Sequence, residues 1–410
     1  MNYPRFAEPR LVEALEDTPV VLIQGPRPSG KTTLARMVGG KRGYAYWSFD
    51  DALTLQAATM DPVGFVDNLP GRVILDEVQR VPGLFTALKV AVDRNREPGR
   101  FLLTGSSNVL LLPKLADSLA GRMGLLRLHP LTQCELAGRD AGFINRLFAG
   151  EFKLAQTARL GEALAHRVAA GGYPAALARQ ASKRRSAWYL DYIETLTQRD
   201  VREMARIASL DILPRLLAFA AGQTVRLVNI SDLAAPFHLS RPTIREYVTL
   251  LERVFLVDEL PPWHTNRLSR LVKAAKLHMG DTGLACALLG IDGAALWRER
   301  ERYGQMLETF VYQELRRQAG WNPDPVRFFH YRDKDNAEVD IVLEQGGGRV
   351  AGVEVKASAT VEAKDFRGLR KLKEAAGDQF AAGVVAYDGA TCVGFGDRLF
   401  AVPVGLLWQV

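Results

Sequence analysis

Residues 24–34 decide the fold of this chain, and they read Gln24-Gly25-Pro26-Arg27-Pro28-Ser29-Gly30-Lys31-Thr32-Thr33-Leu34. Two glycines separated by four residues and followed at once by Lys and Thr match the pattern of a phosphate-binding loop. The apolar residues 20–23 predict a buried parallel strand before the loop, and residues 33–38 have the apolar spacing of a helix. Strand, tight loop and helix are the context that this pattern requires, so we interpret the stretch as a nucleotide site.

The residue types in the loop suit the binding of phosphate and magnesium. Gly25 and Gly30 allow the backbone to point successive N–H groups at one anion, beside the positive end of a helix dipole. Lys31 is expected to reach the β- and γ-phosphates, and the Thr32 hydroxyl is placed for Mg²⁺. We therefore expect ATP and Mg²⁺ as cofactors, bound by Gly25, Pro26, Arg27, Ser29, Gly30, Lys31, Thr32 and Thr33. The alternative is a glycine-rich turn without a ligand.

An acidic pair ends the apolar strand predicted for residues 71–77. In P-loop enzymes an acid at this strand end holds Mg²⁺ through water, and the next carboxylate orients or deprotonates the attacking water. We assign the first role to Asp76 and the second to Glu77.

Two further residues are candidates for the hydrolysis step. Residues 100–108 predict a strand with a polar end at the same sheet edge, where Asn108, or else Thr104 or Ser106, senses the γ-phosphate. The alternative is a polar turn that caps the next helix. Arg122 is placed like an arginine finger that acts in trans on a neighbour's ATP, or else it is a surface arginine in an interdomain salt bridge.

The chain has 410 residues, of which 48% are apolar and 24% are charged, a composition typical of a globular protein. No apolar run approaches the ~20 residues of a membrane span, and the amino-terminal residues do not have the form of a secretory signal. The three cysteines are scattered, which favours reduced thiols and a cytoplasmic protein. Residues 177–276 hold 16 Lys/Arg and 10 Asp/Glu, so this segment carries 16 − 10 = +6 of the net charge of +7. That excess suggests phosphate backbones or acidic partners, or a solvated face that binds nothing.

The order of motifs resembles a large family of prokaryotic AAA+-type ATPases whose carboxyl half is a domain of unknown function. The resemblance rests on the loop itself, Leu75–Pro82, Leu103–Ser106, Leu119–Arg122, His129–Leu131 and the Gly171-Gly172-Tyr173-Pro174 turn. It covers nearly the whole chain, and it implies an ATPase. At positions 28 and 29 this chain has Pro-Ser, whereas Gln-Val is common in the family. These positions lie between the two glycines, so we expect no effect on phosphate binding.

The middle of the chain predicts a winged helix. A helix at 212–221, a short helix at 231–237 and a helix at 241–254 capped by Ser240 precede a wing strand at 255–260. Such a unit presents its last helix to the DNA major groove, although it also serves as a protein-docking module or a lid on an ATPase. The expected DNA contacts are Arg241, Thr243, Arg245, Arg267, Arg270 and Lys273. Arg267, Arg270, Lys273 and Lys276 form a basic stripe that could follow phosphates. The alternative is that this stripe is solvated and binds no nucleic acid. Asp281 or Thr282 is expected to cap a helix.

The last hundred residues resemble the PD-(D/E)xK nuclease core. Glu308 lies on a predicted helix, Asp340 on a strand at 337–343, and Glu354 with Lys356 on one face of a strand at 350–356. In that core the carboxylates hold Mg²⁺ and the lysine orients water for attack on a phosphodiester. The alternatives are DNA binding without cleavage and a stable salt bridge on a strand.

The sequence therefore predicts an α/β chain with four parts. These are a P-loop AAA+-type ATPase domain (1–150), a helical linker or lid (151–210), a winged-helix-like domain (211–300) and a nuclease-like α/β domain (301–410). We expect an ATP-hydrolysing protein that binds and remodels DNA or translocates on it, as a homo-oligomeric ring and in particular a hexamer. The rivals are an ATP-gated defence or signalling switch whose nuclease-like domain docks protein, and an ATP-regulated Mg²⁺-dependent nuclease.

Overall fold

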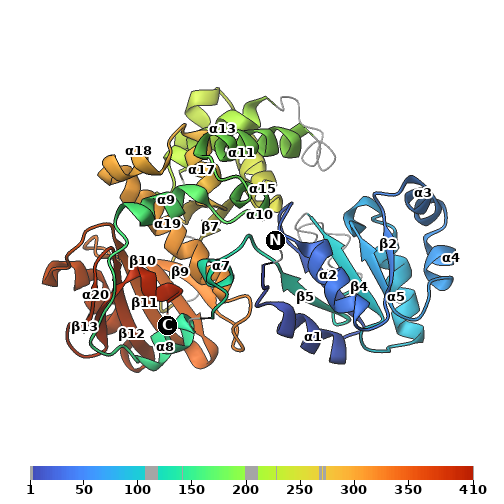
Figure 1. Cartoon of the computed structure of the whole chain (residues 1–410), viewed down its shortest axis with the longest axis horizontal. Coiled ribbons are helices and arrows are strands. Elements are labelled where there is room, and N and C mark those ends of the chain that lie inside the picture. The colour runs from blue at the N-terminus through green and yellow to red at the C-terminus, as the bar shows by residue number, and fades with distance from the viewer. Residues whose placement is uncertain are drawn as a thin grey trace. The chain divides into compact units, whose positions relative to one another are not determined.

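A computed structural model describes residues 3–106, 119–140, 142–198, 211–227, 229–266, 270 and 274–409 (Figure 1). The chain forms two compact units. The first is Met1–Leu131 with Arg253–Phe255, and the second is Thr132–Glu252 with Leu256–Val410. The first unit thus ends before residue 150, where we expected the ATPase domain to end.

The first unit is built on a five-stranded parallel sheet of order β2-β3-β4-β1-β5. Its strands are β1 (Val20–Gln24), β2 (Ala45–Ser48), β3 (Val73–Asp76), β4 (Phe101–Gly105) and β5 (Met123–Arg127). Its helices are α1 (Glu8–Asp17), α2 (Lys31–Gly40), α3 (Ala52–Met60), α4 (Pro62–Asp67) and α5 (Leu84–Arg94), with a short 3-10 helix at Val78–Arg80. The strand, loop and helix predicted around residues 24–34 are confirmed.

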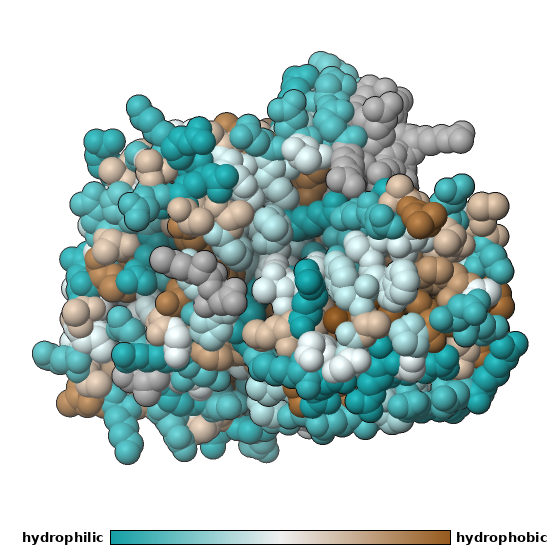
Figure 2. Space-filling model, turned by 45° about the vertical axis from the view of Figure 1, so that its right-hand side comes forward, coloured by the Kyte–Doolittle hydropathy of each residue, from teal (hydrophilic) through white to brown (hydrophobic). Residues whose placement is uncertain are grey.

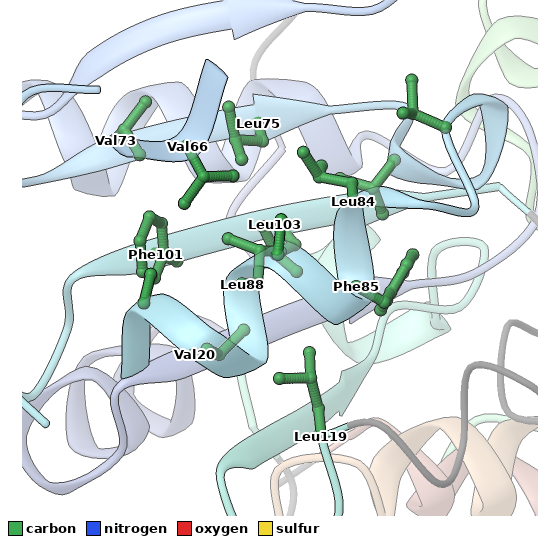
Figure 3. Close-up of a cluster of buried hydrophobic side chains, with 14 of the residues drawn as sticks. Val20, Val66, Val73, Leu75, Leu84, Phe85, Leu88, Phe101, Leu103 and Leu119 are labelled. Carbon is green, nitrogen blue, oxygen red and sulfur yellow. The ribbon is translucent and has the colours of Figure 1, made fainter. Parts of the chain in front are cut away.

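One apolar face of this sheet is covered by α5. Leu84, Phe85 and Leu88 of that helix are at most 1% exposed and face the strands in Figure 3. Opposite them lie apolar side chains of three strands, Val20, Val73, Leu75, Phe101 and Leu103. A second apolar cluster on α1 and α2 includes Val21 and Ile23, whose positions alternate with that of Leu22 in the first cluster. Burial on both faces explains why these strands read as continuous apolar runs.

The parallel arrangement brings three strand ends to one edge of the sheet. Leu75 pairs with Leu103 and Gln24 pairs with Gly105, so β1, β3 and β4 end side by side. The phosphate loop follows β1, Asp76 and Glu77 follow the apolar part of β3, and Ser106 follows β4. The polar residues predicted to act together therefore share this edge.

The second unit begins with a helical middle, residues 132–298. Its helices are α7 (Gln133–Ala137), α8 (Phe143–Ala149), α9 (Glu162–Ala170), α10 (Pro174–Leu177), α11 (Ser182–Leu196), α13 (Ile212–Gly222), α14 (Ile230–Ala234), α15 (Arg241–Arg253), α17 (Thr282–Leu288) and α18 (Gly293–Arg298). After α15 the strands β7 (Val257–Leu260) and β8 (Lys276–Met279) form an antiparallel pair. The helix, short helix, helix and strand that we expected over 212–260 are observed, within a residue or two of the predicted bounds.

The carboxyl-terminal part is a mixed seven-stranded sheet of order β6-β13-β14-β12-β11-β10-β9. Its strands are β6 (Ala155–Gln156), β9 (Arg327–Arg332), β10 (Glu338–Gln345), β11 (Arg349–Lys356), β12 (Phe380–Tyr387), β13 (Thr391–Gly394) and β14 (Leu399–Pro403). Helices α19 (Arg300–Gln318) and α20 (Arg367–Ala376) both contact this sheet (Figure 1). The strands predicted at 337–343 and 350–356 are confirmed as β10 and β11, whereas β6 comes from the region that we read as a helical linker.

The surface shows no extended apolar area in the view of Figure 2, where hydrophobic residues form small groups among hydrophilic ones. None of the helices in the described part of the chain is long and apolar enough to span a bilayer.

Candidate functional site

The phosphate loop has the backbone of an anion site. Gly30 has φ 92°, a left-handed conformation, and stands immediately before the first residue of α2. A Cβ on Gly25 would lie 2.0 Å from the carbonyl oxygen of Leu128, so only glycine fits between the loop and that backbone. Arg5, which the sequence analysis did not single out, donates to the carbonyls of Ser29 and, at 2.7 Å, of His129. It fixes the outer side of the loop.

Lys31 lies over the loop itself. Its ammonium donates to the carbonyl oxygens of Gly25 at 2.8 Å and Pro26 at 3.0 Å, and the residue is only 5% exposed. The buried Lys31 ammonium, held by loop carbonyls, therefore lies at the place where phosphate oxygens are expected. Thr32 and Thr33 follow it in the first turn of α2.

Asp76 is held by three hydroxyl groups. Thr32 donates to its Oδ1 at 2.9 Å, Thr104 donates to the same oxygen, and Tyr46 on the edge strand β2 donates to Oδ2 at 2.8 Å. Burial, and next the hydrogen bond to Asp76, raises the pKa of Tyr46 to about 12. The Thr32 hydroxyl and the Asp76 carboxylate are the hard oxygen ligands that Mg²⁺ prefers, so these residues fit the expected ion.

Glu77 is buried and held from several sides. Its φ of 61° places it in the left-handed region. Arg27 pairs with it through Nε at 3.2 Å and Nη2 at 2.6 Å, Ser106 donates to it at 2.9 Å, and Gln79 donates to the same carboxylate oxygen as Ser106. Burial alone would raise the pKa of Glu77, but the hydrogen bond and charge of Arg27 outweigh it and leave the pKa below its ordinary value. The carboxylate is ionised and held in one orientation.

The two remaining candidates for hydrolysis lie elsewhere. Asn108 falls outside the described residues, whereas its alternatives Thr104 and Ser106 both bond to the acidic pair. Arg122 precedes β5 and its carbonyl accepts from the amide of Val20, so it lies at the edge of the sheet opposite the phosphate loop. Its guanidinium binds Asp93 on α5 through two hydrogen bonds of 2.6 and 3.1 Å. This ion pair is within the first unit, so it is not the interdomain bridge that we considered.

The four residues expected in a nuclease-like site do come together in the second unit. Asp340 on β10 accepts from the Val355 amide at 2.9 Å, and Glu354 pairs with Lys356 at 2.7 Å. Burial, with the charge of Asp340, raises the pKa of Glu354 to about 8 and that of Glu308 well above its ordinary value. Glu354 Oε2 is buried and has no hydrogen-bond partner among the described atoms.

A lysine from the helical middle enters the same cluster. The ammonium of Lys276 on β8 lies 3.0 Å from Glu308 Oε1 and 3.2 Å from Asp340 Oδ1, and its side chain is 6% exposed. Burial alone would lower the pKa of Lys276, but Asp340 and Glu308 outweigh it and raise the pKa above its ordinary value. Throughout the described ranges, no group of three or more His, Cys, Asp or Glu side chains is arranged to hold a metal ion. Our expectation of Mg²⁺ at Glu308, Asp340 and Glu354 is therefore not supported, because Lys276 already lies between two of these carboxylates.

The predicted DNA contacts divide into exposed and buried residues. Ser240 caps α15 as expected, accepting from the Thr243 amide at 3.3 Å, and Arg241 beside it is exposed. Arg245 is half exposed and pairs with Glu259. Arg270 is wrong as a phosphate contact, because its side chain is 11% exposed and pairs with Glu344 at 2.9 Å. Lys276 is buried as described above, and Arg267 and Lys273 fall outside the described residues.

Asp281 is a buried junction in the helical middle. It caps α17 by accepting from the amides of Gly283 and Leu284, which confirms its expected role. It also accepts from Gly172, from the Tyr189 hydroxyl and from Arg317 on α19, at 2.8, 3.1 and 3.0 Å. Glycine is required at position 171 for the turn to approach Asp281, since a Cβ on Gly171 would lie 2.1 Å from Asp281 Oδ1. The turn is a packing feature.

Comparison with known proteins agrees with this geometry. Residues 17–137 match the model of an AAA domain, and residues 161–295 and 303–407 match two domains of unknown function, DUF8612 and DUF4143. The Walker-type ATPase PABY2304 of Pyrococcus abyssi is 17% identical with a TM-score of 0.43, covering 69% of this chain and 94% of that one. The RuvB Holliday junction branch migration motor of Thermotoga maritima is 20% identical with a TM-score of 0.31, covering 62% and 89%.

The loop, the acidic pair and the matching AAA domain define the class of protein, a Walker-type AAA ATPase. The chain belongs to the family of the uncharacterized protein Rv2008c of Mycobacterium tuberculosis, with 31% identity over 401 residues that cover 97% of this chain and 83% of that protein. The uncharacterized protein Mb2031c of Mycobacterium bovis matches with the same values.

Proposed function

We propose that this protein hydrolyses ATP at the phosphate loop and uses the cycle to remodel DNA held through α15. The observation that carries the ATPase part is the shared sheet edge, where Thr32 bonds to Asp76 at 2.9 Å and the ionised Glu77 follows directly. Loop, magnesium ligands and water-activating carboxylate are the minimum set for phosphoryl transfer to water.

Different residues of the chain have different roles in hydrolysis. The backbone N–H groups of the non-proline residues in 25–32 and the Lys31 ammonium would hold the phosphates, and Thr32 with Asp76 would hold a magnesium ion, which would neutralise phosphate charge. Glu77 accepts the proton of the attacking water. Arg27 keeps the Glu77 carboxylate ionised and oriented through their paired hydrogen bonds.

DNA is the partner that the exposed side of α15 supports best. Arg241 is exposed beside the helix cap, and Arg245 is half exposed one turn later. Arginines at the start of such a helix are suited to phosphates and base edges in the major groove. We propose Arg241, Thr243 and Arg245 as the DNA contacts.

We propose a homo-oligomeric ring, in particular a hexamer, as the assembly in which Arg122 acts on a neighbour's ATP. At the far edge of its own sheet it cannot serve its own nucleotide, so its catalytic role requires a neighbouring copy. Size measurement with a non-hydrolysable ATP analogue tests this. We expect the wild-type protein to form an oligomer when the nucleotide is bound. The Arg122→Ala variant should still assemble but should not turn over ATP. A protein that stays monomeric at every concentration would contradict the proposal.

The central experiment measures ATP turnover with no DNA and with single-stranded, duplex and branched DNA, at about 50 and about 200 mM salt. We expect stimulation by DNA that falls steeply with salt, and no turnover in Lys31→Ala. Arg241→Ala should lose stimulation and keep the basal rate, whereas Arg298→Ala, which changes an exposed arginine on α18, should behave as wild type. Absence of turnover under all conditions would overturn the ATPase proposal.

A second candidate is an ATP-gated switch that acts on a protein partner through the second unit. The observation in its favour is the burial of Arg270 and Lys276, two cations of the stripe predicted to follow phosphates. Turnover that is indifferent to every DNA in the experiment above would favour the switch.

A further inference from the structure

The cluster at α19, β10 and β11 contains its own cation. Lys276 donates to Glu308 at 3.0 Å and lies 3.2 Å from Asp340, and the three side chains are 6%, 13% and 12% exposed. The remaining oxygen of Asp340 accepts from the Val355 amide, and Lys356 pairs with Glu354. Three carboxylates thus face two ammonium groups, of which that of Lys276 is buried and that of Lys356 is partly exposed.

This arrangement meets the electrostatic need that a divalent ion would otherwise meet. Buried carboxylates that are close together must be neutralised by protons, by cations or by a metal. An ammonium 3.0–3.2 Å from two of them occupies the space in which their oxygens would share a metal ion, since Mg²⁺ and Mn²⁺ bind oxygen at only ~2.0–2.2 Å. With the ammonium in this position, the two carboxylate oxygens cannot share a metal ion.

The same lysine joins two parts of the second unit. It lies on β8 of the helical middle, and its partners lie on α19 and on β10 of the carboxyl-terminal sheet. Nearby contacts repeat this connection. Gln313 on α19 donates to Asp258 of β7 at 3.1 Å and to the Met279 carbonyl at 2.9 Å, and Arg316 pairs with Asp258.

We propose that Lys276 is the built-in cation of this cluster, in place of a divalent metal. The carboxyl-terminal sheet domain therefore works without metal and does not cleave phosphodiesters by metal-assisted chemistry. Its cluster is an ionic joint that fixes the β7–β8 pair, which directly follows α15, to the carboxyl-terminal sheet. This inference is independent of ATP hydrolysis at the phosphate loop.

The test measures Mn²⁺ binding to full-length, nucleotide-free protein by the loss of the free-ion paramagnetic resonance signal. All variants carry Asp76→Asn, which removes the magnesium ligand of the first unit. We expect no Mn²⁺ site in this parent protein, and a gain of at least tenfold in Mn²⁺ affinity when Lys276→Met removes the ammonium. Adding Glu308→Gln to Lys276→Met should abolish that gain.

Two controls separate the outcomes. Lys276→Arg keeps a cation and should stay without a Mn²⁺ site, and Lys364→Met changes an exposed lysine paired with Glu362 and should do the same. A Mn²⁺ site in the parent that Asp340→Asn removes would overturn the proposal, even if Lys276→Met does not fold. A folded Lys276→Met variant that gains no site would also overturn it.

Discussion

At the scale of single residues, Glu77 is the side chain on which hydrolysis depends. It is ionised, oriented by Arg27 and Ser106, and adjacent to the magnesium ligand Asp76. We expect Glu77→Gln to reduce the ATP turnover number by about 100-fold or more, which is the contribution of a positioned general base. ATP affinity should persist, because Glu77 does not hold the loop.

Phosphate release and fluorescence titration with a labelled nucleotide measure these two quantities separately. Arg27→Ala is the companion variant, in which Glu77 loses its main hydrogen-bond donor but keeps its carboxylate. Turnover in this variant should shift toward higher pH, because the pKa of Glu77 rises when Arg27 is removed. An unchanged turnover number in Glu77→Gln would refute its assignment as the base.

Gly25 gives a second prediction at this scale. An added methyl group would lie 2.0 Å from the Leu128 carbonyl oxygen, so the loop must move away from β5 to accept it. We expect Gly25→Ala to weaken ATP binding by at least tenfold and to lower the melting temperature of the first unit. Gly40→Ala is the matched control, because a Cβ there meets nothing within 4 Å and alanine favours the helix that ends at this residue. Equal ATP affinity in the two variants would contradict this account.

At the scale of elements, Asp281 connects the start of α17 with the Gly171-Gly172 turn and α19. Its side chain is 1% exposed and pairs with Arg317, whose side chain is 5% exposed. Removing one partner of a buried ion pair leaves an uncompensated charge, so we expect Asp281→Ala to lower the free energy of unfolding by about 3–5 kcal/mol. Asp292→Ala removes only an exposed cap of α18 and should cost about 1 kcal/mol.

Urea unfolding followed by tryptophan fluorescence measures this difference, since Trp47 is the only one of the six tryptophans in the first unit. Similar losses in the two variants would mean that Asp281 acts only as a helix cap.

The elements also show what could be predicted from the sequence. The loop at 24–34, the strands at 337–343 and 350–356 and the caps at Ser240 and Asp281 depend on neighbours within a few residues, and all were predicted. Arg270 was misplaced because its partner Glu344 is 74 positions away in the chain and on another strand. Arg5 and Tyr46 were missed, and Lys276 was assigned to the basic stripe, for the same reason, because each acts through a contact formed only by the folded chain.

At the scale of the whole molecule, stability should depend on pH through Glu314. This glutamate of α19 is fully buried and accepts from the Gln133 amide at 2.9 Å, and burial raises its pKa from 4.5 to about 7. The folded state therefore binds the proton more tightly than the unfolded state. The contribution of Glu314 to stability is greatest below pH 4.5, falls as the pH rises toward 7, and then levels off, for a total change of about 3 kcal/mol from this group.

Glu314→Gln removes this contribution while keeping an oxygen for the Gln133 amide. We expect the difference in unfolding free energy between the variant and the wild type to change by about 3 kcal/mol from pH 4.5 to 8, in favour of the variant at high pH. Urea unfolding at the two pH values measures it, and a difference that is the same at both would contradict the shift.

The edge strand β6 has a consequence for how the protein is made. Residues 155–156 pair with β13, and the Thr157 amide donates to the Ala390 carbonyl at 2.7 Å, although most of the sheet is encoded after residue 327. On a ribosome that adds roughly 5–20 residues per second, this segment waits about 10–50 s for its partner strand. Nascent chains thus expose the unpaired segment of β6, which chaperones can bind. The carboxyl-terminal sheet is completed only near the end of translation.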